Sequence, residues 1–333
     1  MDTQDTSCAP DSVAVLIPCY NEGLTIASVV RDFLRELPHA RVYVYDNNST
    51  DNTRAAARAG GATVACESRQ GKGNVVRRMF SDIDADVYVL VDGDETYDAA
   101  SATELIAALA ENHMAMVVGR RVHHSASAYR RGHVMGNALL QRLVGFLFGH
   151  SINDLLSGYR VFSRQFVKSF PALSSGFEIE AELTVHALSL QLPVQEIDTP
   201  YGERPAGSAS KLQTYRDGFR ILGMIVNLLK NERPMLFFGV LAAILEIAAL
   251  ALIYPIFVTY VETGLVPRFP TAILTTGIGL LGFIGLTCGL VLDTVTRGRR
   301  EAKYLAWLAA GERISQVRRL VRARVSPAAV GAR

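Results

Sequence analysis

Apolar and polar positions alternate over the first 200 residues in a way that predicts strands separated by helices. The predicted strands are short apolar runs at 13–18, 41–45, 87–91 and 114–118. The predicted helices, in which apolar residues recur every three or four positions, cover 26–37, 50–59 and 103–110, with Thr25 placed to cap the first. This alternation favours an α/β domain with a parallel, doubly wound sheet, which binds ligands at the carboxyl ends of its strands.

Two long apolar blocks follow near the C-terminus, at Met235–Val261 and Thr271–Leu292. The second block contains no charged residue, and the first contains only Glu246. About 20 apolar residues span the hydrocarbon core of a bilayer, so the blocks predict a transmembrane hairpin. The alternative is a buried helical hairpin of a soluble protein. Within the hairpin, Glu246 either faces the partner helix or lies near an interface.

Basic residues flank the predicted hairpin on its outer side. They are Lys230 and Arg233 before it, and Arg297, Arg299, Arg300 and Lys303 after it. Arg268 is the only basic residue in the connection between the two blocks. Because cytoplasmic flanks are enriched in lysine and arginine, we expect an integral protein of the cell membrane with the large N-terminal region and the C-terminal tail in the cytoplasm.

Composition adds three limits to this interpretation. The net charge of +2 is too small to indicate a nucleic-acid partner, and the bases gather beside the membrane segments instead. The four cysteines are scattered without metal-ligand or disulfide spacing, which favours a reducing compartment. Residues 1–12 are polar and acidic, unlike a signal peptide.

Polar clusters follow three of the predicted strands, at 18–22, 46–51 and 92–94. Asp92 and Asp94 are separated by one glycine, so a tight turn can direct both carboxylates at one Mg²⁺ or Mn²⁺ ion that also binds phosphate oxygens. Asp46 is a candidate hydrogen-bond acceptor for a nucleobase, and Asp51 is a candidate cap of the next helix. Lys72 lies between two glycines at the start of a helical pattern, where it either contacts a phosphate or base or is a solvated basic turn.

These motifs carry a resemblance to a known family. Pro18-Cys19-Tyr20-Asn21-Glu22, the segment 46–53, Gly71-Lys72-Gly73 and Asp92-Gly93-Asp94, in this order and spacing, resemble family-2 glycosyltransferases of GT-A fold. The segments 154–160 and 204–211 resemble the polyprenyl-phosphate branch, which includes dolichyl-phosphate mannose synthase and bacterial enzymes that glycosylate undecaprenyl phosphate. The resemblance covers about residues 12–232 and implies a doubly wound, Rossmann-like mixed sheet followed by a two-helix transmembrane hairpin.

The resemblance implies roles for individual residues. The nucleotide-sugar site would contain Pro18, Tyr20, Asn21, Glu22, Asp46, Lys72, Asp92 and Gly93, with Asp92 and Asp94 as the ligands of Mg²⁺ or Mn²⁺. The acceptor phosphate site would contain Arg121, Arg131, Ser157, Arg204, Ser210 and Lys211. The residues expected to carry catalysis are Asp94, Asp154 and Arg204. In this set Asp154 orients the acceptor or positions an arginine.

Two positions depart from the family pattern. Many relatives carry Asp-Asp-Gly where this chain has Asp46-Asn47-Asn48, which leaves the base preference open. Glu95-Thr96 follows the carboxylate pair where many relatives have Leu-Gln. This difference leaves open whether the protein supplies a third metal ligand.

The implied domain boundaries follow the same reasoning. We expect a polar tail (1–11), a GT-A glycosyltransferase domain (12–211), a juxtamembrane amphipathic helix (212–234), two transmembrane helices (235–293) and a basic cytoplasmic tail (294–333). The stretch 130–149 mixes bases with large apolar residues, so it either lies in the membrane interface or packs on the sheet.

The expected activity is hexosyl transfer from a UDP- or GDP-linked sugar to the phosphate of a polyprenyl phosphate, with inversion, at the cytoplasmic membrane face. A phosphate monoester has a second pKa of about 6, so it needs positioning more than a strong general base. The alternatives are a processive polysaccharide synthase, whose Gln-x-x-Arg-Trp motif this chain lacks around Trp307, and a non-catalytic subunit of a lipid-linked sugar flippase. A homo-oligomer is permitted by Gly285 and Gly289, whose spacing allows close helix packing.

Overall fold

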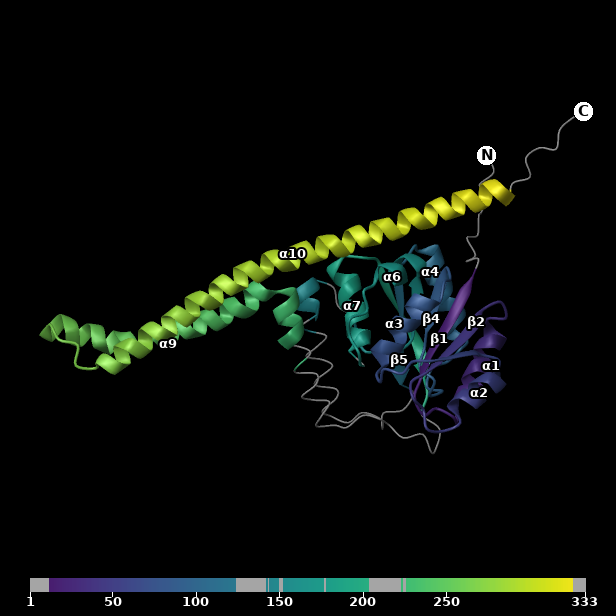
Figure 1. Ribbon diagram of the computed structural model, residues 1–333, viewed down its shortest axis with the longest axis horizontal. Coiled ribbons are helices and arrows are strands. Elements are labelled where there is room, and N and C mark those ends of the chain that lie inside the picture. The colour runs from purple at the N-terminus through teal and green to yellow at the C-terminus, as the bar shows by residue number, and fades with distance from the viewer. Residues whose placement is uncertain are drawn as a thin grey trace, which may run out of the picture. The chain divides into compact units, whose positions relative to one another are not determined.

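The N-terminal part of the chain folds around one mixed sheet of seven strands (Figure 1). The computed structural model describes residues 12–123, 142, 144–149, 152–176, 178–203, 223 and 226–325. The strands are β1 (Val13–Cys19), β2 (Arg41–Asp46), β3 (Thr63–Cys66), β4 (Val87–Leu90), β5 (Met116–His123), β6 (Arg160–Ser163) and β7 (Val194–Tyr201), in the spatial order β3-β2-β1-β4-β6-β5-β7.

Most neighbouring strands of this sheet are parallel, and β6 is the exception. β1 pairs in parallel with β2 and β4, and β5 pairs in parallel with β7. β6 pairs antiparallel with both β4 and β5. The doubly wound prediction is therefore confirmed, and β6 makes the sheet mixed, as the family resemblance implies. The described residues 152–159, directly before β6, contain no helix, and β6 begins at the edge where β4 and β5 end.

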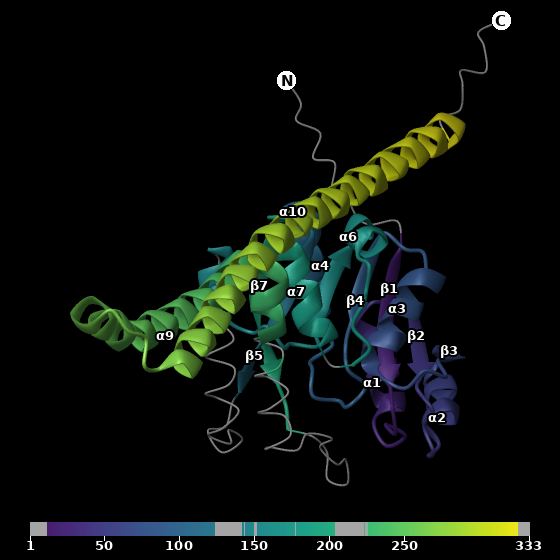
Figure 2. The same ribbon diagram turned by 60° about the vertical axis from the view of Figure 1, so that its left-hand side comes forward.

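Helices cover both faces of the sheet, as Figure 2 shows. α3 (Lys72–Asp82), α6 (Arg164–Ser169) and α7 (Ile179–Ser189) pack on one face. The other face is covered by α1 (Ile26–Glu36), α2 (Thr53–Gly60) and α4 (Ser101–Glu111). In β1, Ala14 and Leu16 enter the first core while Val15 and Ile17 enter the second, as the two-residue period of a strand requires. Burial on both faces explains why the strands are continuous apolar runs.

Two details at helix starts differ from the predictions. Thr25 precedes α1 but makes no capping hydrogen bond, because its hydroxyl donates instead to the carbonyl oxygen of Gly93 at 2.6 Å. The second helix begins at Thr53 rather than Thr50. Its first amide donates to a carboxylate oxygen of Asp51 at 3.0 Å, in agreement with the role predicted for Asp51.

The two apolar blocks form α9 (Pro234–Thr263) and the first part of α10 (Phe269–Val325). Both helices are long and apolar enough to cross a membrane, with mean hydropathies of 2.6 and 2.0. Only 11% of the most apolar window of each is buried, which argues against the core of a soluble protein. Of the two positions predicted for Glu246, the structure has the first: a Cβ added at Gly282 of α10 would lie 2.6 Å from its carboxylate.

α10 does not stop at the predicted membrane boundary but continues as one helix to Val325. The predicted separate tail at 294–333 is therefore helical over its described part. Residues 218–302 form one compact unit, and the residues from Lys303 onward belong to the unit that contains the sheet. In the sheet-containing unit Trp307 packs against the core on the face that carries α6, and the side chain of Gln165 in α6 donates to the Trp307 carbonyl oxygen at 2.9 Å. The predicted juxtamembrane helix at 212–234 lies largely outside the described residues, and 226–232 are helical.

Trp307→Ala is expected to destabilise the sheet-containing unit by about 2 kcal/mol, because it removes partly buried apolar surface. The hydrogen bond from Gln165 uses the backbone of residue 307 and survives the substitution. Thermal unfolding followed by circular dichroism measures the change. The neighbouring, exposed Leu308 is the control. Equal melting temperatures for Trp307→Ala and Leu308→Ala would show that the C-terminal part of α10 does not stabilise this unit.

Candidate active site

The carboxyl edge of the sheet gathers most of the predicted site residues. Asp46 ends β2, and the turn after β1 contains Tyr20, Asn21 and Glu22. Asp92, Gly93 and Asp94 follow β4, and Arg121 lies near the end of β5. Because β1 separates β2 from β4, the chain winds away from β1 in both directions. This is the switch point at which doubly wound sheets bind ligands.

Hydrogen bonds join the turns that follow β1 and β2. The amide of Asn21 donates to the Ser49 hydroxyl at 2.8 Å, and the Asn21 side-chain oxygen accepts from the Thr50 amide at 2.8 Å. Asn21 has a φ of 53°, a left-handed conformation that asparagine tolerates better than most residues. Pro18 is half-buried within β1, whereas Tyr20 is exposed. The two turns therefore form one rigid rim with the ring of Tyr20 on its surface.

Asp46 is buried beneath this rim. One of its carboxylate oxygens accepts from the Ser49 amide at 3.3 Å and lies 3.5 Å from Nε of Arg54. The other oxygen, Oδ1, has no hydrogen-bond partner among the described residues. A buried acceptor without a partner is costly, so this oxygen fits a polar donor supplied by a bound ligand.

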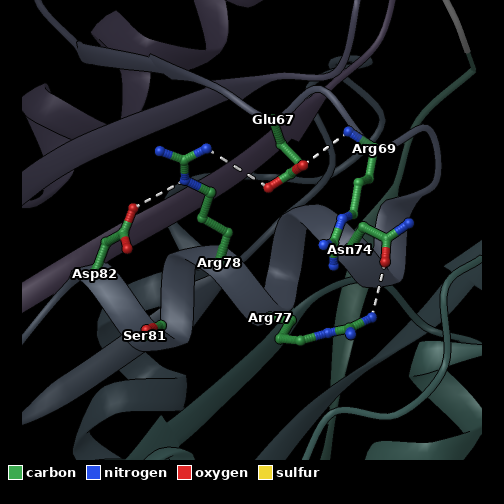
Figure 3. Close-up of a pocket in the computed structure, with 7 residues that line it drawn as sticks. All are labelled: Glu67, Arg69, Asn74, Arg77, Arg78, Ser81 and Asp82. Carbon is green, nitrogen blue, oxygen red and sulfur yellow. Dashed lines mark hydrogen bonds and ion pairs between the residues drawn. The ribbon is translucent and has the colours of Figure 1, made fainter.

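Asn47, where the chain departs from the family pattern, organises the connection between β3 and α3. Its amide nitrogen donates to the carbonyl oxygens of Glu67 and Arg69, and its oxygen accepts from the Gly71 amide at 2.7 Å. A shallow hollow lies beside this connection (Figure 3), lined by Glu67, Arg69, Asn74, Arg77, Arg78, Ser81 and Asp82.

The guanidinium of Arg78 in this hollow is paired with Glu67 and Asp82. Its charge is therefore already balanced by neighbouring acids. The hollow also lies outside the set of residues predicted for the site. We conclude that it shapes the connection rather than forming the reaction centre.

The loop after β4 holds the predicted carboxylate pair. Asp94 is buried, and its Oδ1 accepts from the hydroxyl of Thr96 at 2.6 Å. Gly93 is tightly enclosed, since an added Cβ would lie 2.8 Å from the sulfur of Cys19. An added Cβ at Gly158 would lie 2.4 Å from Asp92, so the chain that enters β6 touches the first carboxylate. The close approach of these segments fixes the positions of both acids.

This pair fits a divalent metal by its chemistry. Mg²⁺ and Mn²⁺ prefer oxygen ligands, and Mg²⁺ is commonly held by one or two carboxylates together with substrate phosphates and water. Among the described residues no group of three or more metal-ligating side chains occurs. A site built on Asp92 and Asp94 therefore depends on ligand oxygens to complete the coordination.

Arg121 and Asp154 form a two-pronged ion pair beside the carboxylates. Arg121 Nε donates to Asp154 Oδ2 at 2.8 Å, and Nη2 donates to Oδ1 at 2.7 Å. The guanidinium also lies 5.5 Å from the centre of the Tyr201 ring. Burial by itself lowers the pKa of Arg121, but Tyr97 and Asp154 outweigh it and raise the pKa well above its ordinary value. Of the two roles predicted for Asp154, the geometry favours positioning an arginine.

The loop that carries Asp154 is held from two sides. Glu196 of β7 accepts hydrogen bonds from the amides of Asn153 and Asp154, each at 2.9 Å. The fully buried Arg160 donates to the carbonyl oxygens of Leu155 and Ser157 at 2.6 and 2.8 Å. Burial lowers the pKa of Arg160 to about 10, which still leaves it charged at neutral pH. The position of Asp154 is therefore set by distant parts of the chain.

Ser157, which is predicted to contact an acceptor phosphate, makes its side-chain contacts inside the protein. Ser157 is fully buried, and its hydroxyl donates to the carbonyl oxygen of Gly119 at 2.6 Å. The hydroxyl oxygen of Ser157 also accepts from the amide of Tyr159 at 3.2 Å. Ser157 therefore joins the loop to β5, and its side chain is enclosed by protein. Four further predicted residues, Arg131, Arg204, Ser210 and Lys211, lie outside the described residues.

One further acid, Glu180 of α7, meets the site although it was not among the residues predicted for it. Lys72 Nζ lies 2.6 Å from Glu180 and 2.5 Å from Asp92. Burial lowers the pKa of Lys72, but the two carboxylates outweigh it, so the pKa is raised above the ordinary value. Lys72 is thus not a solvated turn residue but an ion-pair partner of Asp92. Only the acidic run 178–182 hinted at this contact.

Comparison with known proteins agrees with this geometry. A model of the family described as Glycosyl transferase family 2 matches residues 14–170. The glycosyltransferase AglJ of Haloferax volcanii is 36% identical over 231 residues, which cover 69% of this chain and 76% of AglJ. The chain belongs to glycosyl transferase family 2. This member of the family also resembles a dolichyl-phosphate hexose transferase of the same organism, with 29% identity over 67% of this chain and 96% of that protein.

Solved structures support the fold of this family-2 glycosyltransferase. Glucosyl-3-phosphoglycerate synthase from Mycobacterium tuberculosis, crystallised with Mn²⁺, UDP and phosphoglyceric acid, superposes with a TM-score of 0.54. The match covers 66% of this chain and 78% of the synthase at 21% identity. The GT-A fold expected from the sequence is therefore confirmed, as is the assignment to the glycosyltransferases, and a non-catalytic subunit is set aside.

Proposed function

We propose that this glycosyltransferase moves a hexose from a nucleoside diphosphate sugar to the phosphate of a polyprenyl phosphate at the cytoplasmic face of the cell membrane. The observation that carries the proposal is the presence, in one chain, of a carboxylate pair at the sheet edge and two helices long and apolar enough to cross a membrane. The similarity to a protein named dolichyl-phosphate hexose transferase supports the lipid acceptor.

The donor is assigned to the ends of β1, β2 and β4. The unpartnered oxygen of Asp46 would accept a hydrogen bond from the nucleobase. Tyr20, Asn21 and Glu22 would surround the base and ribose. Asp92 and Asp94 would hold the diphosphate through Mg²⁺ or Mn²⁺. When bound there, the cation supplies Lewis-acid stabilisation of the departing nucleoside diphosphate.

The acceptor is assigned to the arginine side of the site. Its phosphate monoester is largely dianionic at neutral pH, so one of its oxygens attacks the anomeric carbon without a strong general base. Attack from the face opposite the leaving diphosphate inverts the configuration. Arg121, held by Asp154, would reduce the repulsion between the two phosphate-bearing substrates. Arg131, Arg204 and Lys211 are proposed to add to this positive surface, as the family resemblance implies.

A panel of UDP- and GDP-linked hexoses tests the proposal when each is incubated with the purified full-length enzyme and a polyprenyl phosphate in vesicles. We expect one donor to yield a glycolipid whose sugar is attached through a phosphodiester. Polyprenol without its phosphate is the matched control acceptor. Transfer to the polyprenol, or to a soluble phosphate alone, would contradict the proposed acceptor.

The orientation in the membrane is expected to place both ends of the chain in the cytoplasm, since the basic residues flank the hairpin on its outer side. A protease added to sealed right-side-out vesicles should therefore leave the catalytic domain intact, while inverted vesicles should permit cleavage. Cleavage of that domain in sealed right-side-out vesicles would reverse the proposed topology.

A further inference from the structure

The start of α3 packs without space against the segment that leads into α7. A Cβ added at Gly71 would lie 2.2 Å from the Ser175 carbonyl oxygen, and one added at Gly73 would lie 2.2 Å from that of Ser174. The amide of Gly73 donates to the Gly176 carbonyl oxygen at 3.1 Å. Both glycines are therefore required by a backbone contact, and that contact brings the residue between them, Lys72, to α7.

Lys72 consequently lies between two acids from different parts of the chain. Its ammonium is 2.5 Å from Oδ1 of Asp92 and 2.6 Å from Oε1 of Glu180. The side chains of Lys72 and Glu180 are 9% and 5% exposed, whereas that of Asp92 is 32% exposed. Glu180 and Lys72 are thus enclosed, and of the three side chains only that of Asp92 is partly open to solvent.

The charges of these three residues decide how strongly Asp92 attracts a cation. Lys72 alone would neutralise Asp92, because the two groups carry opposite unit charges in direct contact. With Glu180 present, the three residues carry one net negative charge. A buried carboxylate that contacts the lysine from behind therefore restores the charge that the lysine removes.

We propose that Glu180 is a positioning residue that balances Lys72, so that Lys72 orients the Asp92 carboxylate without cancelling its attraction for a divalent cation. The inference rests on the metal role proposed for Asp92. It assigns the Gly71-Lys72-Gly73 motif to the carboxylate of the cation site, in place of direct contact with the nucleotide.

The proposal makes predictions of opposite sign for two single substitutions. Glu180→Gln removes a negative charge and is expected to weaken Mn²⁺ binding about tenfold. Lys72→Met removes a positive charge and is expected to tighten Mn²⁺ binding by about the same factor. A purely structural role for the pair would instead make both variants bind worse. The double variant carries the wild-type net charge, so its affinity should return close to the wild-type value.

The experiment is a titration of the purified full-length enzyme with Mn²⁺ alone, with free Mn²⁺ measured by electron paramagnetic resonance. Glu182→Gln is the matched control, because Glu182 lies on the same helix and accepts from the amides of Leu173 and Ser174 instead of from Lys72. Its Mn²⁺ affinity is expected to be unchanged. Circular dichroism of each variant reports whether the fold is retained.

The outcomes separate the inference from the proposed function. Unchanged Mn²⁺ affinity in Glu180→Gln, or equal losses in Glu180→Gln and the double variant, would overturn the role of Glu180 while leaving the metal site in place. A wild-type enzyme that transfers sugar in EDTA and binds no Mn²⁺ would overturn the metal role itself. If Lys72→Met does not fold, recovery of affinity from Glu180→Gln to the double variant still decides the question.

Discussion

Replacing Asp94 by asparagine is expected to lower the rate of sugar transfer by about a hundredfold or more, which corresponds to about 2.7 kcal/mol of lost transition-state stabilisation. Asp94 is buried and accepts a hydrogen bond from Thr96 through Oδ1. Asparagine keeps an oxygen for that hydrogen bond but removes the charge proposed to hold the metal. Asp94→Ala removes both and should reduce transfer at least as much. Initial rates at saturating donor and acceptor measure the effect.

The control for this experiment is Asp98→Asn, a change of the same kind at the start of α4. Asp98 accepts from the amide of Ala100 and the hydroxyl of Ser101, which concern only the helix start. We expect near-normal rates for this variant. Chelation of the wild-type enzyme with EDTA should reproduce the loss seen in Asp94→Asn, and added Mn²⁺ or Mg²⁺ should restore the activity. Full activity in EDTA would remove the metal from the proposed reaction.

Removing the partner of Arg121 is the second change with a large expected effect. Asp154→Ala leaves a largely buried guanidinium without its two charge-assisted hydrogen bonds, and loss of one member of a buried pair typically costs about 3 kcal/mol. We also expect the KM for the lipid phosphate to rise, because Arg121 loses its fixed orientation. Chemical denaturation measures the first effect, and initial rates at varied acceptor concentration measure the second.

The neighbouring arginine on the same strand offers the matched control. Arg120 pairs with Asp198 in a similar way, but both side chains of that pair are exposed. An exposed ion pair contributes little to stability, so Asp198→Asn should change neither the stability nor the acceptor KM measurably. Equal effects of Asp154→Ala and Asp198→Asn would show that Arg121 has no special part in acceptor binding.

The positions of the carboxylates could be predicted because they follow from local sequence. Apolar runs identified β1, β2 and β4, and parallel strands end at one edge of a sheet, so Asp46, Asp92 and Asp94 had to lie near one another. The two long apolar helices were predictable for the same reason, since length and apolar composition alone decide whether a helix is able to span a bilayer.

The tertiary structure decided the features that depend on contacts between distant residues. β6 is only four residues long, and its antiparallel direction is seen only in its pairing with β4 and β5. Ser157 belongs to a motif that resembles a phosphate site, yet its hydroxyl joins β5 and is buried. The sequence places Trp307 in a basic tail, whereas in the structure it packs on the core that also contains residues of α6.

The same distinction applies to the charges of the active site. The sequence by itself determined the fold class, the carboxylate pair, the two long apolar helices and the family. The sequence predicted Lys72 as a phosphate or base contact or a solvated turn, and Glu180 was not among the predicted site residues, because sequence spacing gives the type of each charge but not its partner. Only the backbone contact of Gly71 and Gly73 with 174–176 brings both beside Asp92. Burial then decides whether such charges are solvated or act on one another, and burial is a property of the folded chain.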